Sequence, residues 1–321
     1  MPRRSAPSPA HQELQQLAGD PTAQAARAVQ VLAHVKDIQG VRAALEVLSR
    51  HHLPAARPAL RACYEHYAED GVRRDAGTYL RAATLQALRP LADASDLPLL
   101  EHAANTYEFL PPARSEEASL LRSTALVVMH DVDERLARFH AVRLLADPYT
   151  SRLSGEPAIT AVRVLVAGGY LEPLYYYALH QPVPDSDVLS ECLKNLAGLP
   201  PSLLPRLVDK YASSDDEMVL VGLLDLALAA DQAAFVHEFL RTTTKYVVYR
   251  YGVAQLVASH TERWLAELAQ QAQHERNARK LAILEEALSL GRADAIIQTV
   301  LAAVRRSQKS AARETDIRQS D

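Results

Sequence analysis

Residues 75–109 have the sequence DAGTYLRAATLQALRPLADASDLPLLEHAANTYEF, and this stretch decides the fold. Its apolar residues recur at intervals of about three to four, which predicts amphipathic helices over Asp75–Leu91 and Leu97–Phe109. A break centred on Asp93 separates the two, and Pro98 stands where the first turn of a helix tolerates proline. The stretch therefore predicts a pair of helices joined by a short turn.

The same pattern of two apolar helices and a short break recurs along nearly the whole chain. The breaks are spaced by 41, 38, 37, 30, 32, 30 and 31 residues. A recurring helix pair of this length is the signature of an α-solenoid, whose core is built by stacking neighbouring pairs. We expect an all-α fold made of stacked antiparallel helix pairs, with about eight repeats. The breaks lie at His52, Asp93, Asp131, Gly168, Gly198, Ala230, His260 and Gly291.

The individual helices follow from the same periodicity, with proline and capping residues marking their ends. Besides the two above, we expect helices over Thr22–Lys36, Gln39–Arg50, Pro54–Glu69, Glu116–Met129, Asp133–Ala146, Pro157–Ala167, Leu171–His180, Ser186–Leu196, Ser202–Ala212, Asp215–Ala229, Gln232–Thr242, Tyr246–Ser259, Glu262–Gln273, Asn277–Leu290 and Ala293–Arg306.

The two ends of the chain differ in composition from the rest. The first ten residues, MPRRSAPSPA, are rich in Pro, Ser and Arg, so residues 1–13 are expected to be a disordered N-terminal segment. Residues 14–306 are expected to form a single solenoid domain. The polar tail, residues 307–321, is expected to be disordered.

Charge and composition exclude several classes of protein. With 35 basic and 39 acidic residues, the formal net charge is −4, which disfavours a dedicated nucleic-acid binder. The 2 cysteines, Cys63 and Cys192, form neither a metal motif nor a disulfide framework. The most apolar segment, Met218–Ala230, is too short to span a membrane, and no apolar stretch follows the N-terminus as in a signal peptide. We expect a soluble, cytoplasmic protein.

Two segments carry a resemblance to a known family. Asp75 is followed by the pair Leu80-Arg81, and Glu116 is followed at the same spacing by Leu121-Arg122. This pattern resembles the second helix of HEAT repeats, which belong to the armadillo-type α-solenoids. Val162-Arg163 matches only in part, because Pro157 stands where the acidic residue is expected. The resemblance implies a right-handed α-solenoid in which acidic and Arg side chains form a ladder between adjacent repeats.

The later repeats depart from this pattern. Leu193 and Gly222 stand where the family places arginine. The C-terminal half is therefore expected to be a diverged array of the armadillo or HEAT type.

Basic residues at corresponding positions are the first candidates for binding. Arg81, Arg122, Arg163 and Lys194 lie in successive second helices, which line the concave side in this architecture. Such a stripe would attract an acidic peptide or a phosphate backbone. The alternative for Arg81 and Arg122 is the structural ladder.

Clustered tyrosines are the second candidates. Tyr249 and Arg250 lie in the helix expected over Tyr246–Ser259, and Tyr and Arg are favoured binding anchors when they are exposed. The alternative is that the tyrosine rings fill space between repeats and only their hydroxyls reach solvent.

One string resembles the metal core of HD-domain phosphohydrolases. His130-Asp131 follows His102 by 28 residues, and Asp187, Asp209 or Asp225 would supply the distant carboxylate. The resemblance implies a divalent metal that activates water. The alternative is a helix end, where histidine favours the dipole and aspartate caps the next helix.

A protein of this class is expected to be a non-enzymatic scaffold that binds another protein or peptide segment along its concave groove. No Gly-rich phosphate loop, Gly-x-Ser-x-Gly elbow or zinc spacing occurs in the sequence, so no cofactor is expected. The metal-dependent phosphohydrolase and a HEAT-like nucleic-acid-binding module are the alternatives. The sequence leaves the oligomeric state open.

Overall fold

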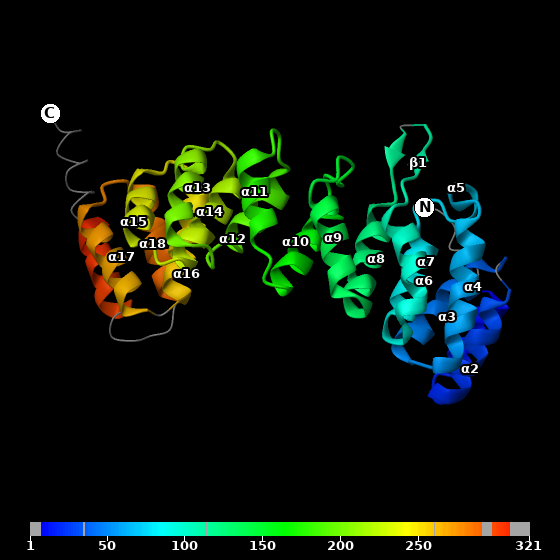
Figure 1. Cartoon of the computed structure of the whole chain (residues 1–321). Helices are drawn as coiled ribbons and strands as arrows, with labels where there is room; N and C mark the ends of the chain where they lie inside the picture. Colours follow the sequence, from blue (N-terminus) through cyan, green and yellow to red (C-terminus); the bar gives the residue numbers. More distant parts are fainter. Residues whose placement is uncertain (1–7, 35, 113, 260, 291–296, 309–321) are drawn as a thin grey trace. The chain divides into compact units, whose positions relative to one another are not determined.

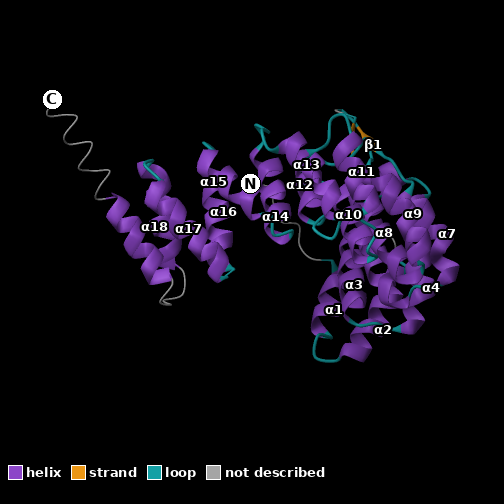
Figure 2. Cartoon of the chain, turned by 60° about the vertical axis from the view of Figure 1, so that its left-hand side comes forward, coloured by secondary structure: helices purple, strands orange, loops and turns teal. Residues whose placement is uncertain are grey.

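The computed structural model describes residues 8–34, 36–112, 114–259, 261–290 and 297–308. Apart from one two-stranded ladder, the regular structure of these residues is helical, as Figures 1 and 2 show, so the prediction of an all-α chain is confirmed. The chain divides into two compact units, Met1–Pro173 and Leu174–Asp321. A single domain over residues 14–306 stays a prediction.

The first unit consists of short helices joined by tight turns. They are α1 (Pro9–Gln16), α2 (Pro21–Leu32), α3 (Ile38–Arg50), α4 (Arg57–Ala68), α5 (Gly71–Arg74), α6 (Tyr79–Leu88), α7 (Leu97–Ala104), α8 (Ser119–Val132), α9 (Glu134–Leu145) and α10 (Ala158–Ala167), with short 3-10 turns at Pro54–Ala56, Arg89–Leu91 and Ala94–Asp96.

Helices of the first unit pack in two rows. The first row is α3, α6, α8 and α10, each of which packs against the next (Figure 1). The other helices cover it: α2 lies on α3, α4 on α6, α7 on α8, and α9 on α8 and α10. Leu45, Leu80 and Leu121 of the first row are buried in this core. This alternation is what the recurring helix pair predicts.

Aspartates fix where several of these helices begin. Asp20, Asp37 and Asp133 each accept a hydrogen bond from the backbone N–H three residues later, at the start of α2, α3 and α9. Such caps satisfy N–H groups that have no partner within the helix. With these caps, α2, α3 and α9 begin within one residue of their predicted starts.

The segment between α7 and α8 is the main correction to the predicted helices. The predicted helix Leu97–Phe109 ends at Ala104, and the predicted helix Glu116–Met129 begins at Ser119. Between them, β1 (Phe109–Leu110) pairs antiparallel with β2 (Ser115–Glu116). Pro111 and Pro112 at the turn lack the N–H that a helix needs, and the glutamates at the base of this β1–β2 hairpin bind arginines of the first row.

The second unit repeats the arrangement in two rows. Helices α12 (Ser186–Lys194), α14 (Glu217–Ala229), α16 (Tyr246–Ala258) and α18 (Ala278–Leu290) pack in succession. Helices α13 (Leu204–Tyr211), α15 (Ala233–Thr242) and α17 (Glu262–His274) cover α14 and α16, while α11 (Glu172–His180) spans the boundary between the units. Leu224, Val253 and Leu284 lie in the buried core of this unit.

A close approach between two helices explains one residue that departs from the HEAT pattern. At Gly222 of α14, an added Cβ would lie 2.6 Å from Cα of Ser190 in α12. No side chain fits in that space, so glycine lets these two backbones touch. An arginine, which the resemblance to HEAT repeats implied at this position, would not fit there.

At the two termini the predicted boundaries change. Residues 9–13, predicted to be disordered, lie in α1, because Ser8 caps this helix and Leu14 is buried. The predicted last helix, Ala293–Arg306, is described as helical only over residues 297–308. Residues 307 and 308, predicted to belong to a disordered tail, are helical, while the predicted disordered residues 1–7 and 309–321 lie outside the described residues.

None of the helices in the described part of the chain combines the length and apolar character needed to cross a lipid bilayer.

Candidate functional site

Arg81, a predicted binding residue, is buried within the first unit, with only 1% of its surface exposed. Its Nε lies 3.1 Å from Asp75, and its two terminal nitrogens donate to Glu108 at 2.6 and 2.8 Å. Burial alone would lower the pKa of this guanidinium, but the two carboxylates outweigh that effect and raise it. Gly71 makes room for the ion pair, because a Cβ there would overlap Glu108 and Arg81.

Arg122 is fully buried and has the same kind of environment. It donates to Glu116 at 2.7 and 2.9 Å, and its Nε lies 3.0 Å from Asp147, although not aligned for a hydrogen bond. The ring of Tyr107 covers the guanidinium, 4.2 Å from its Cζ. Neither this arginine nor Arg81 can reach a ligand at the surface. Both form ion pairs of the kind that the ladder alternative expects.

These two arginines clamp the β1–β2 hairpin. Glu108 precedes β1 and binds Arg81 of α6, whereas Glu116 ends β2 and binds Arg122 of α8. Glu116 also accepts from the backbone N–H of Glu108, which ties the two sides of the hairpin together. The acidic residues of this hairpin thus connect two helices of the first row.

The other predicted binding residues are divided between the two units. Arg163 is exposed on α10 of the first unit. Lys194 and Arg250 belong to the second unit. Lys194 forms an ion pair with Glu191, and Arg250 forms one with Glu286. Tyr249 is completely buried and is a core residue, not an anchor, as the alternative interpretation expected.

The residues of the HD-like string have separate surroundings. The Nδ1 atom of His130 is buried and has no hydrogen-bond partner among the described residues. His102 Nδ1 lies 3.0 Å from the Tyr64 hydroxyl, and Asp131 accepts from Arg89 at 2.5 Å. Among the described residues, no group of three or more His, Cys, Asp or Glu side chains is placed to hold a metal ion. Asp187, Asp209 and Asp225, the predicted distant ligands, all belong to the second unit. The described residues therefore give no support to a metal site.

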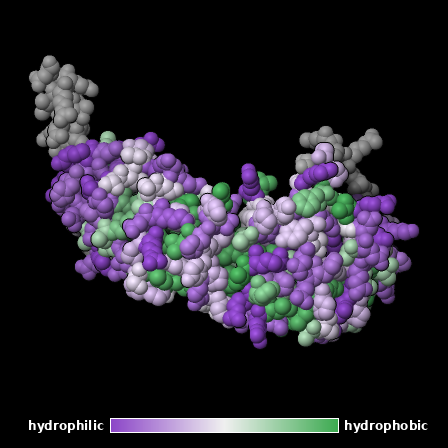
Figure 3. Space-filling model, turned by 45° about the horizontal axis from the view of Figure 1, so that its top comes forward, coloured by the Kyte–Doolittle hydropathy of each residue, from purple (hydrophilic) through white to green (hydrophobic). Residues whose placement is uncertain are grey.

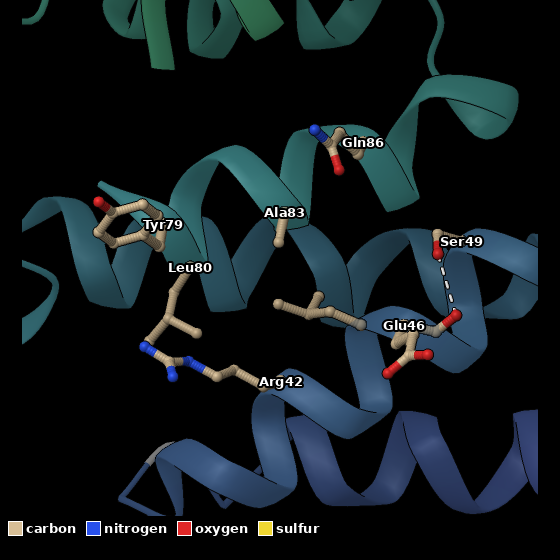
Figure 4. A pocket seen from close by; sticks show the side chains of 8 residues that line it. Arg42, Glu46, Ser49, Tyr79, Leu80, Ala83 and Gln86 are labelled. Carbon is tan, nitrogen blue, oxygen red and sulfur yellow. Dashed lines mark hydrogen bonds between the residues drawn. The ribbon is translucent and has the colours of Figure 1, made fainter. Parts of the chain in front are cut away.

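A groove on the first row is the candidate functional site (Figure 4). It has a volume of about 570 Å³ and lies between α3 and α6. The buried side chains of Leu45 and Leu80, with Ala83, make an apolar floor. The remaining lining residues are Arg42, Glu46 and Ser49 from α3 and Tyr79 and Gln86 from α6.

This groove continues onto α8. A second hollow of about 320 Å³ shares Gln86 with the first and is lined further by Arg89, Ser123, Thr124, Val127, Val128 and Thr160. The hydroxyls of Ser123 and Thr124 already donate to the carbonyl of Leu120 in their own helix. We call the two hollows together the first-row groove. It runs across α3, α6 and α8 to the start of α10.

Several polar groups in the first-row groove have no partner within the described structure. Arg42 and Gln86 are exposed and form no hydrogen bond or ion pair with described residues. Tyr79 is 58% exposed although it is a large aromatic residue. By contrast, Glu46 pairs with Arg50 and Arg89 with Asp131. The free donors and the exposed ring are the features of the groove that a ligand would use.

Sequence reasoning missed the residues of this groove. Arg42, Tyr79 and Gln86 lie next to the apolar stripe of their helices, at positions that periodicity assigns to solvent. The signal that marks them is weak: a large aromatic residue at an outward position, as at Tyr79. Which outward positions face a neighbouring helix depends on how the helices stack.

Comparisons with known proteins add little. No protein-family model matches the chain, and no curated protein matches it either. A solved structure described as the crystal structure of an engineered protein is similar over 94% of this chain and 98% of its own, with 15% identity and a TM-score of 0.35.

Proposed function

We propose that this protein is a non-enzymatic adaptor that binds a segment of another protein along the first-row groove. We further propose that the chain is a right-handed HEAT-like or armadillo-type α-solenoid of about eight repeats that is located in the cytoplasm. What supports the array is the same two-row packing in each unit. What supports binding is the unpartnered polar lining of the groove.

The chemistry of the lining favours a peptide over other ligands. The carboxamide of Gln86 both donates and accepts, as main-chain amides do, and it lies where the two hollows meet. Arg42 supplies an unpaired cation at one side, and Leu45, Leu80 and Ala83 supply an apolar floor. A segment with a carboxylate for Arg42 and a small apolar side chain for the floor fits this combination.

Acidic groups along the groove argue against a nucleic-acid backbone. Glu46 lines the first hollow and pairs with Arg50, and the guanidinium of Arg89 beside the second hollow pairs with Asp131. A phosphate backbone is held by several unpaired cations in a row, and the described lining offers one, Arg42.

The proposal is tested by placing a photo-cross-linking amino acid at Gln86, with the same group at Glu65 as a control. Glu65 is an exposed residue of α4 outside the groove. In cells, we expect a cross-linked protein of defined mass from position 86 that is absent from position 65. Equal labelling from both positions would contradict the proposal.

The cross-linked segment then allows the groove to be measured directly. We expect Tyr79→Ala and Arg42→Glu each to weaken binding of a peptide of that segment about tenfold, or roughly 1.4 kcal/mol. Tyr176→Ala is the matched control, because Tyr176 is exposed to a similar degree in the second unit. Fluorescence polarisation gives the affinities, and unchanged affinity in both groove variants would reject the site.

A further inference from the structure

The outward side of α9 carries a second surface, separate from the first-row groove. Arg135, Arg138, Phe139 and Val142 are spaced by 3, 4 and 7 residues from the first, so they share one side of the helix. Phe139 is 71% exposed and Val142 45% exposed. We call these four residues the α9 surface. On the face drawn in Figure 3, hydrophobic residues occur in small patches between hydrophilic ones.

A cavity of about 620 Å³ lies at the α9 surface. Its other lining residues are Arg143, Tyr170 in the turn after α10, and Glu172 and Pro173 at the start of α11. All of them belong to the first unit. The α9 surface is thus one wall of a hollow, not a flat face.

Arg138 is held in place by an aromatic ring. Its Cζ lies 4.3 Å from the centroid of Tyr170, whose hydroxyl donates to Glu134 at 3.4 Å. The ring lies against the guanidinium, whose N–H donors form no hydrogen bond with described residues. No described carboxylate forms an ion pair with Arg138 or with Arg135. A fixed guanidinium with free donors is suited to bind a carboxylate through two hydrogen bonds.

Arg143 has a different part in the cavity. It donates to the Tyr107 hydroxyl at 3.1 Å and to the carbonyl of Ala104 at 2.7 Å. These bonds hold its side chain against the wall, so it shapes the cavity and adds positive charge near it. Arg135 and Arg138 are the cations available to a ligand.

We propose that the α9 surface binds a short segment of another protein in which an Asp or Glu side chain stands beside a bulky apolar residue. The carboxylate pairs with the stacked guanidinium of Arg138, helped by the charge of Arg135. The apolar side chain covers Phe139 and Val142 and removes their exposed surface from water, which favours binding. An exposed apolar pair next to unpaired arginines is complementary to such a segment in both charge and hydrophobicity.

Other occupants fit less well. Glu172 lines the cavity, and Glu134 lies at its edge beside Tyr170, so an extended phosphate backbone would meet carboxylates on that side. The net charge of −4 also disfavours a polyanion. A purely apolar partner would leave the guanidiniums of Arg135 and Arg138 buried without a counter-ion.

The test is selection of a displayed random-peptide library on the full chain, compared with selection on Arg138→Gln and on Phe139→Ser. Both side chains lie at the surface, and equal circular dichroism and melting temperature will show that the variants fold. We expect a set of peptides that is enriched on the wild type and lost on both variants. That set is expected to carry Asp or Glu next to Phe, Leu or Ile.

A peptide synthesised from this set gives the quantitative readout. We expect each variant to weaken its binding at least about tenfold by fluorescence polarisation. Arg73→Gln and Val72→Ser on α5 are the matched controls, because both residues are exposed outside the cavity, and they are expected to leave affinity unchanged.

Several outcomes would overturn the proposal. One is that no peptide enriched on the wild type fails to be enriched on both variants. Another is that the peptides that depend on both residues lack acidic or lack apolar side chains. A third is that oligo-dT displaces the bound peptide as effectively as unlabelled peptide does. Association of the chain with itself that is abolished by Phe139→Ser would also overturn it. We expect Tyr79→Ala, a change in the first-row groove, to leave the selected peptides unchanged. A negative result for the α9 surface can therefore be told apart from a negative result for the first-row groove.

Discussion

Two tyrosines of α16, only two residues apart, differ in whether their hydroxyl has a hydrogen-bond partner. Tyr249 is fully buried, and its hydroxyl has no hydrogen-bond partner in the described structure. Tyr251 donates to both carboxylate oxygens of Asp225, at 2.7 and 2.9 Å. A buried hydroxyl without a partner loses its hydration and gains nothing in return, whereas a bond to a carboxylate is among the stronger ones.

Removing each hydroxyl should therefore have opposite effects. We expect Tyr249→Phe to raise the free energy of unfolding by about 1 kcal/mol, and Tyr251→Phe to lower it by about 1.5 kcal/mol. Urea unfolding at neutral pH, followed by circular dichroism, measures both. A loss of stability in Tyr249→Phe equal to that in Tyr251→Phe would show that the buried hydroxyl has a partner.

Tyr249 also predicts how stability depends on pH. Burial raises the pKa of its phenol above the ordinary value near 10. Below about pH 10 the phenol is neutral in both the folded and the unfolded state, so the effect on stability is constant. As pH rises further, the unfolded chain loses this proton first, and stability falls.

We expect the melting temperature of the wild type to drop between pH 9 and 11, and that of Tyr249→Phe to drop less, since about one proton fewer is linked to unfolding. Thermal melts at several pH values measure the slope. Identical slopes in the two proteins would contradict the raised pKa.

At the scale of the elements, basic side chains repeatedly close the C-terminal ends of helices. Arg143 donates to the carbonyl of Ala104 at the end of α7. Lys210 donates to Ala178 and Leu179 at the end of α11, at 2.9 and 2.8 Å, and Lys280 does the same at the end of α15. Each cation satisfies carbonyls that lack a partner and opposes the negative end of the helix dipole. These hydrogen bonds connect one helix pair to the next.

Replacing one of these lysines should cost stability beyond that of an ordinary surface ion pair. We expect Lys210→Met, which keeps the aliphatic stem, to lower the free energy of unfolding by about 1 kcal/mol. Lys194→Met removes only a pair within one helix, with Glu191, and is expected to cost at most about 0.5 kcal/mol. Chemical denaturation compares the two, and equal values would argue against the capping role.

At the scale of the whole molecule, each helix contacts mainly its neighbours along the rows. The main contacts of α8, for example, are with α6, α7, α9 and α10. Stability in such an arrangement is a sum of local terms and nearest-neighbour interfaces. The buried ion pairs of Arg81 and Arg122 are interfaces of this kind, since each binds a carboxylate of the β1–β2 hairpin.

Removing Arg122 tests this local character. Arg122→Met leaves Glu116 and Asp147 buried without their cation, which should cost about 3 to 5 kcal/mol. By hydrogen exchange we expect faster exchange in α6, α8, α9 and the hairpin, and unchanged rates in α14, α16 and α18. Faster exchange to one common rate in every helix would contradict nearest-neighbour stability.

The sequence predicted the helices well and the site poorly. Helical periodicity is a property of neighbouring residues, so α3, α9 and α14 begin and end within a few residues of the predicted bounds. Arg81 and Arg122 were recognised by their spacing from Asp75 and Glu116. Their burial was not, because exposure depends on which residues from elsewhere in the chain cover them.

By itself, the sequence determined an all-α chain of paired helices and the ends of those helices that caps, prolines and apolar stripes specify, because these signals act over a few residues. Only the tertiary structure decided that Glu108 and Asp147 complete the two arginine clusters, that Tyr249 is core, and that Arg42, Tyr79 and Gln86 border one groove. These contacts form when helices stack and bring together residues that are tens of positions apart in the sequence. No local pattern specifies which outward side chains will face each other.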